Sequence, residues 1–177
     1  MDLQLSAIQD RALEICNNGI DDDKDGYTDC MDKKCGNSPY CVNKQCKAAA
    51  SVDPMPLDGS AVFRLMQTAG TQVSAQPPCE TKPGGGDAVI LVNLPGQATI
   101  NIGYAQIGQH VFALYPVLGT GLVCDAAKPF GCMASTGMNN SGTVTFPKVP
   151  AGKYYVVVAA DQPGDEGSVS LKFTAMP

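Results

Sequence analysis

The chain has 177 residues, of which 44% are hydrophobic and 16% are charged, so it is long enough and apolar enough to bury the core of one domain. The net charge is −5, and much of it lies in one short acidic stretch. The sequence has no basic patch interleaved with aromatic residues, which argues against a nucleic-acid-binding protein, and no apolar run reaches the length of a membrane span.

Eight cysteines accompany a single histidine, His110. An even number of cysteines in an acidic, turn-rich chain predicts disulfides and an oxidising compartment, so we expect a secreted or outer-surface protein. Zinc is the alternative, but it would need paired cysteine knuckles or more histidines. The predicted disulfide cysteines are Cys16, Cys30, Cys35, Cys41, Cys46, Cys79, Cys124 and Cys132.

Residues 6–17 are predicted to form a short helix that leads into the acidic stretch. Ser6 and Gln9 have the spacing of a capping box, and Asn18-Gly19 is a typical helix stop. Glu14 lies near the end of this helix. It is a surface residue, an extra metal ligand, or an acceptor that orients the loop that follows.

Residues 21–32 have the spacing of a calcium-binding loop. Aspartates occupy positions 1, 3, 5, 9 and 12 of the twelve, and Gly26 at position 6 permits the sharp turn that aims the ligands inward. Position 7 supplies a backbone carbonyl. Position 12 is Asp32 rather than the glutamate that makes a bidentate contact in such loops. The predicted calcium ligands are Asp21, Asp23, Asp25, the Tyr27 carbonyl, Asp29 and Asp32.

The string from Glu14 to Cys35 reads E-x-C-N-N-G-I-D-D-D-x-D-G-x-x-D-C-x-D-x-x-C. It resembles the cysteine-bearing acidic metal-binding motif of secreted myxobacterial-type proteins, and its aspartate spacing is also similar to thrombospondin type-three repeats. The resemblance implies calcium and an extracytoplasmic setting, and it implies no activity.

We divide the chain into a helix and cysteine-rich calcium module (1–47), a connector (48–59) and a β-sandwich (60–177). Five cysteines precede residue 47 and three follow residue 78, so at least one bridge joins the two groups if all eight pair within the chain. Two short bridges are expected, Cys41–Cys46 and Cys124–Cys132. The crossing bridge is expected from Cys79 to Cys16, Cys30 or Cys35.

From residue 60 the hydrophobic pattern has a period of two, which is typical of β-strands. Together with the many glycines and prolines, it predicts a mainly β fold, an antiparallel jelly-roll-like sandwich. Asp161, Asp165 and Glu166, around a Pro-Gly turn, are predicted to form a solvated hairpin tip or a second cation site. The expected strands are 61–67, 87–94, 97–104, 110–115, 142–146, 153–160 and 168–174.

Three segments of this part resemble the bacterial pre-peptidase C-terminal domain. They are 87–100, with Pro95-Gly96 between two strands; 112–115, an aromatic-x-Leu-Tyr strand; and 150–158, an Ala-Gly-x-Tyr-Tyr turn and strand. The resemblance implies a jelly-roll-like accessory domain of secreted proteases and surface proteins, without catalytic residues.

A catalytic centre is not predicted. His110 begins a strand with no nucleophile motif near it, so a Ser-His-Asp triad is not indicated. We therefore expect a non-enzymatic calcium-binding accessory, adhesion or structural domain, whose partners are other domains of its parent protein or a surface partner. A calcium-dependent carbohydrate-binding module is the first alternative, although the chain lacks tryptophan. A fragment of a secreted protease is the second.

Overall fold

The computed structural model describes residues 13–16, 20–24, 33–35, 48–68, 77–82, 84–118 and 128–177. Within these residues the fold is mainly β, with one short 3-10 turn, η2 (Lys33–Cys35). The strands are β1 (Ala48–Val52), β2 (Val62–Gln67), β3 (Asp87–Leu94), β4 (Ala98–Gln106), β5 (His110–Pro116), β6 (Gly131–Ala134), β7 (Ser141–Val149), β8 (Gly152–Ala160) and β9 (Ser168–Met176).

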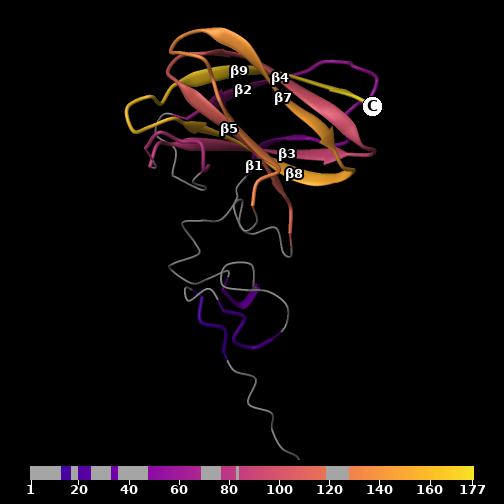
Figure 1. Ribbon diagram of the computed structural model, residues 1–177, viewed down its shortest axis with the longest axis vertical. Coiled ribbons are helices and arrows are strands. Elements are labelled where there is room, and N and C mark those ends of the chain that lie inside the picture. Colours follow the sequence, from indigo (N-terminus) through magenta and orange to yellow (C-terminus); the bar gives the residue numbers. More distant parts are fainter. Residues whose placement is uncertain are drawn as a thin grey trace, which may run out of the picture.

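The strands form two sheets that face each other as a sandwich (Figure 1). One sheet has the order β1-β3-β8-β5-β6 and the other has the order β2-β9-β4-β7. All pairs are antiparallel except β1 with β3, which is parallel. The predicted mainly β sandwich is therefore confirmed, with one parallel pair at the edge of the five-stranded sheet.

All seven predicted strands are present, and β3 has the predicted bounds. Two further strands were not predicted. β1 lies in the segment assigned to the connector, where Ala48, Ala49 and Ala50 give no alternating apolar pattern. β6 has only four residues, all partly or fully exposed, so its sequence lacks the signal of a buried strand.

The side chains of β8 explain how the core is divided. Tyr154 and Val156 belong to the cluster between the two sheets, whereas Tyr155 and Val157 belong to a second cluster on the outer face of the five-stranded sheet. Successive strand residues point to opposite faces, so a continuous apolar run is buried on both. The outer cluster consists of Val89, Val111, Ala113, Tyr115, Tyr155, Val157 and Ala159, with Cys79, Leu91, Val117 and Cys132 packed against it.

One of the two described disulfides differs from the predicted pairing. Cys79 pairs with Cys132 across 53 residues, so the predictions that Cys79 reaches the N-terminal cysteines and that Cys132 pairs with Cys124 are wrong. The reason is topological, because β6 lies at the edge of the five-stranded sheet and carries Cys132 beside residue 79. Cys16 pairs with Cys35. The other predicted disulfide cysteines, Cys30, Cys41, Cys46 and Cys124, lie outside the described residues.

The predicted helix is not found where the structure describes it. Leu13–Cys16 form irregular backbone, and residues 6–12 and 17 lie outside the described part. The amide of Ile15 donates to the Asp22 carboxylate at 3.2 Å rather than to a carbonyl four residues earlier. A helix at this point would need that amide in its own hydrogen-bond ladder.

The hairpin-tip prediction needs a correction at two of its three residues. Asp161 and Asp165 are buried, with exposed fractions of 5% and 7%. Asp161 accepts hydrogen bonds from the Thr81 amide and hydroxyl at 2.9 and 2.7 Å, which offset the cost of burying its charge. Long-range contacts of this kind leave no trace in the local sequence.

Candidate metal centre

The carboxylates of Glu14, Asp21 and Asp23 come together in the N-terminal part of the chain. One oxygen from each lies within 4.8 Å of the others. Two of these residues are predicted calcium ligands, and Glu14 is the residue whose role the sequence left open. The remaining predicted ligands, Asp25, Tyr27, Asp29 and Asp32, lie outside the described residues.

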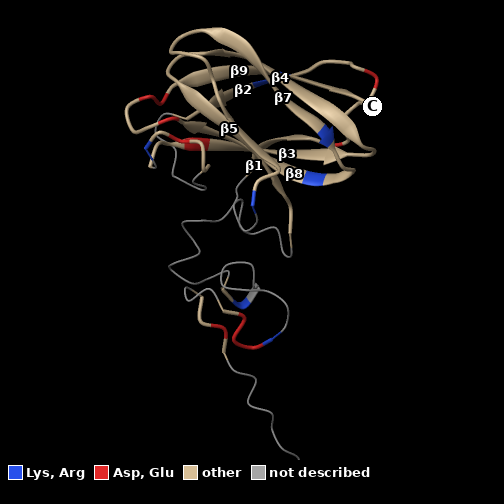
Figure 2. Cartoon of the chain, in the orientation of Figure 1, with Lys and Arg blue, Asp and Glu red and all other residues tan. Residues whose placement is uncertain are grey.

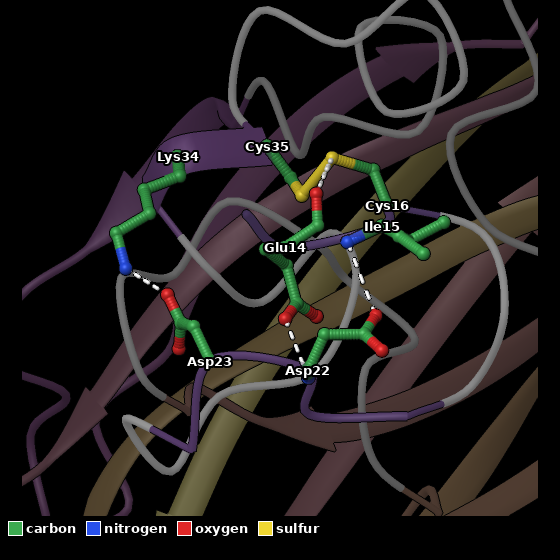
Figure 3. Close-up of polar contacts among 7 residues, drawn as sticks. All are labelled: Glu14, Ile15, Cys16, Asp22, Asp23, Lys34 and Cys35. Atoms are coloured by element: carbon green, nitrogen blue, oxygen red, sulfur yellow. Dashed lines mark hydrogen bonds and ion pairs between the residues drawn. A yellow bond between two sulfur atoms is a disulfide. The ribbon is translucent and has the colours of Figure 1, made fainter. Parts of the chain in front are cut away.

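Glu14 also fixes the start of the acidic loop, as Figure 3 shows. Its Oε2 accepts a hydrogen bond of 2.9 Å from the backbone amide of Asp22. The Asp22 carboxylate in turn accepts from the amide of Ile15 at 3.2 Å. These reciprocal bonds tie the segment before the loop to the loop itself. The Asp22 carboxylate accepts one of them and is not a member of the Glu14, Asp21 and Asp23 group.

A disulfide and an ion pair close the other side of the cluster (Figure 3). Cys16, two residues after Glu14, is bonded to Cys35 at the end of η2. The preceding residue, Lys34, places its ammonium against Asp23 Oδ2. The Asp23 side chain has no exposed surface, so its charge is balanced by Lys34 rather than by bulk water.

The donor set fits a hard divalent cation. Carboxylate oxygens are the ligands that calcium prefers, and three of them converge here within one coordination sphere. Without a cation, three carboxylates this close repel one another, and Lys34 is the described counter-charge. The chemistry of these residues therefore suits calcium better than zinc, which takes nitrogen and sulfur ligands.

Glu14 could not have been assigned to the cluster from the sequence by its spacing alone. It lies eight residues before Asp22 and two before a disulfide cysteine, so the Cys16–Cys35 bridge determines which side of the loop its side chain reaches. The sequence does not provide that pairing, because eight cysteines allow 105 connectivities.

His110 lies in a buried polar network at one end of the sandwich. Its Nε2 is 3.0 Å from Thr68 Oγ1, and its Nδ1 donates to Gln106 Oε1 at 3.3 Å. Gln106 in turn donates to Ser135 Oγ at 2.8 Å. Burial lowers the pKa of His110 to about 4, against a smaller opposing effect of the Glu166 charge. The imidazole is neutral at physiological pH and has no exposed surface, so it serves packing.

Acidic residues, red on the cartoon of Figure 2, lie in the N-terminal part and at one end of the sandwich, where β3 begins and β8 ends. The described residues at this end are Glu80, Asp87, Asp161, Asp165 and Glu166.

Within the described ranges, no helix is long and apolar enough to cross a membrane.

No family model matches the sequence, and no curated protein matches it. Among solved structures, the chain is similar to the pre-peptidase C-terminal domain of a Bacillus anthracis collagenase, with 14% identity over 72% of this chain and 97% of that domain and a TM-score of 0.42. It is also similar to PliG, a periplasmic inhibitor of g-type lysozyme from Aeromonas hydrophila, with 12% identity over 73% of this chain and 98% of that one and a TM-score of 0.45.

A third similar structure is a carbohydrate-binding module of Cellvibrio mixtus lichenase 5A in complex with cellotriose, with 16% identity, coverage of 64% and 96%, and a TM-score of 0.34. At these values the similarity concerns the arrangement of strands alone.

Proposed function

We propose that the chain is a non-enzymatic, calcium-binding accessory domain of a secreted or cell-surface bacterial protein. A calcium module over residues 1–47 precedes a connector, 48–59, and a β-sandwich, 60–177. The sandwich gives a rigid body for adhesion to a surface partner or for packing against other domains of the parent protein.

The observation that carries this proposal is the convergence of Glu14, Asp21 and Asp23 within 4.8 Å. The full ligand set adds Asp25, the Tyr27 carbonyl, Asp29 and Asp32, in the order that a calcium loop requires. A bound calcium ion neutralises the carboxylates and so allows the loop to close. Such a loop has little apolar core of its own, and the Cys16–Cys35 bridge supports the same short segment.

Two features support a non-enzymatic, extracytoplasmic role. The single histidine is buried among Thr68 and Gln106, where no substrate reaches it. All four described cysteines are paired, which favours an oxidising compartment.

Calorimetric titration of chelator-treated, disulfide-intact protein with calcium tests the proposal. We expect a dissociation constant on the order of 10⁻⁴–10⁻³ M or tighter, as in extracellular modules. The double variant Asp21→Asn, Asp23→Asn removes two ligand charges without changing shape, and it should bind at least about tenfold more weakly.

A matched control removes the same charge elsewhere. Asp53 and Asp58 are exposed, and each accepts a hydrogen bond that an asparagine oxygen can keep, from Asn93 Nδ2 and the Ser60 amide. The variant Asp53→Asn, Asp58→Asn should bind calcium like the parent protein. Equal affinity of both double variants would refute the proposed site.

A glycan partner is the second candidate, and one observation favours it. Phe63 lies on the outer face of the four-stranded sheet with 65% of its surface exposed, and Lys172 Nζ lies 5.9 Å from its ring centroid. The neighbouring outward residues, Ser170 and Thr174, carry hydroxyls. An exposed ring beside hydroxyl groups and one cation can stack on a sugar and hydrogen-bond to it.

Affinity electrophoresis in gels that contain neutral or acidic polysaccharides tests this second candidate. Retardation that is lost in Phe63→Ala but kept in Leu65→Ala, an exposed residue of the same strand and face, would support it. Identical mobility of all three proteins in every gel would exclude glycan binding at this face.

A further inference from the structure

Residues 77–82, which we call the strap, cross the edge of the five-stranded sheet and are held at three points. Cys79 is bonded to Cys132 of β6. Thr81 donates from its amide and its hydroxyl to the Asp161 carboxylate, and the Lys82 amide donates to the Asp161 carbonyl at 3.2 Å. The strap is therefore fastened to the edge strand β6 by a covalent bond and to the residue after the central strand β8 by a set of hydrogen bonds.

The strap covers part of the outer apolar cluster. Cys79 and Cys132 pack against that cluster, whose members Val111, Ala113 and Val157 have no exposed surface. An apolar sheet face needs such a cover, because leaving it in water costs about 25 cal/mol for each Å².

Glu80 lies in the middle of the strap, where the surroundings of its carboxyl group are unfavourable for a charge. Both of its oxygens are buried and have no hydrogen-bond partner. Within the described residues they are the only buried side-chain oxygens or nitrogens of which this is true. A buried carboxylate without a partner is costly, whereas a neutral carboxylic acid costs much less.

The surrounding charges increase that cost. Asp87, at the start of β3, and Asp161, after β8, are the ionisable groups that act on Glu80, and both are negative. Lys82 is the cation of the strap itself, but its side chain is exposed. Burial first, and then the charges of Asp87 and Asp161, raise the pKa of Glu80 to about 7.

We propose that residues 80–82 of the strap form a proton-controlled latch, which closes onto Asp161 at the end of β8 when Glu80 is protonated and loosens when Glu80 ionises. In the open strap the Glu80 carboxylate reaches water and leaves Asp87 and Asp161. The Cys79–Cys132 bridge keeps residue 79 in place, so the movement concerns residues 80–82 and their bonds to Asp161.

The effect of pH on strap closure follows from the thermodynamic linkage between closure and protonation of Glu80. A carboxyl group whose pKa is higher in the closed state favours that state at low pH, and the advantage is lost as the pH rises from the open-state value near 4.5 through 7. With these two values, closure weakens about tenfold between pH 6 and pH 8.

Amide hydrogen exchange of Thr81 and Lys82 tests the latch, measured in chelator with the disulfides intact and corrected for the intrinsic pH dependence of exchange. We expect protection to fall about tenfold between pH 6 and pH 8 in the parent protein and to stay constant in Glu80→Gln, which mimics the protonated acid. Constant protection in the parent protein, or the same fall in Glu80→Gln, would overturn the latch.

A control variant and a direct titration of Glu80 complete the test. Glu166→Gln removes a carboxylate at the same end whose pKa is lowered chiefly by backbone hydrogen bonds, so it should keep the fall in protection. Carboxyl ¹³C shifts of the parent protein report Glu80 directly and do not depend on any variant folding. A Glu80 titration midpoint near 7 supports the latch, and a midpoint near 4.5 contradicts it.

Discussion

The carboxylate of Glu14 accepts a hydrogen bond of 2.9 Å from the backbone amide of Asp22, and it lies within 4.8 Å of the Asp21 and Asp23 ligand atoms. One side chain thus orients the loop and offers it a ligand. Glu14→Ala should weaken calcium binding at least about tenfold in a calorimetric titration, since a charge-assisted hydrogen bond contributes about 1.5–3 kcal/mol.

Glu14→Gln separates the two roles, because an amide oxygen still accepts from the Asp22 amide but carries no charge. Affinity near the parent value in this variant would assign Glu14 to orientation, and affinity near that of Glu14→Ala would assign it as a ligand. Parent-like binding by Glu14→Ala would remove Glu14 from the centre altogether.

Lys34 competes with any cation for the carboxylate of Asp23, because its ammonium lies against Oδ2. Lys34→Gln should therefore tighten calcium binding, by up to about fivefold for a partly exposed ion pair. Calcium titrations at two salt concentrations provide the check, since the gain should shrink as salt screens the pair. Weaker binding in Lys34→Gln would mean that Lys34 supports the loop rather than opposing the cation.

His110 makes stability depend on pH in a predictable direction. Its pKa is lowered to about 4 in the fold, below the ordinary value of 6.5, so its contribution is fully present above pH 6.5 and is lost as the pH falls towards 4. His110→Gln should lessen this acid-side loss in thermal unfolding curves. The chain has one histidine, so a single imidazole NMR signal reports the titration, and a midpoint near 6.5 would contradict this account.

The Cys79–Cys132 bridge should stabilise the fold substantially, because it closes a segment of 53 residues. The double variant Cys79→Ser, Cys132→Ser should lose about 2–4 kcal/mol of unfolding free energy. Peptide mapping without reduction should recover this pair and Cys16–Cys35. If the other four cysteines also pair within the chain, Cys124 must join Cys30, Cys41 or Cys46. A Cys79 peptide linked to an N-terminal cysteine would contradict the fold.

The strands were predictable because their apolar runs reflect burial. The run of β8 places Tyr154 in the inter-sheet core and Tyr155 in the outer cluster, as the period of two predicts. β1 was not predictable, because alanines carry little pattern and its partner β3 lies some 40 residues away along the chain.

For the candidate site, the sequence predicted Asp21 and Asp23 by their loop spacing. It could not determine that Glu14 joins them, since that depends on which cysteine pairs with Cys16. The burial of Glu80 depends in the same way on the partner of Cys79 and on the position of Asp161 in space. Side chains that meet through long-range contacts need the tertiary structure to be recognised.

Hydrogen exchange measured with calcium and with chelator shows whether calcium holds the acidic loop in place. Chelator should lower protection in peptides spanning residues 13–35 and leave β3 and β8 unchanged, because the apolar sandwich does not depend on the ion. Unchanged protection across residues 13–35 would contradict this prediction, and would make Glu14, Asp21 and Asp23 a solvated acidic cluster rather than a calcium site.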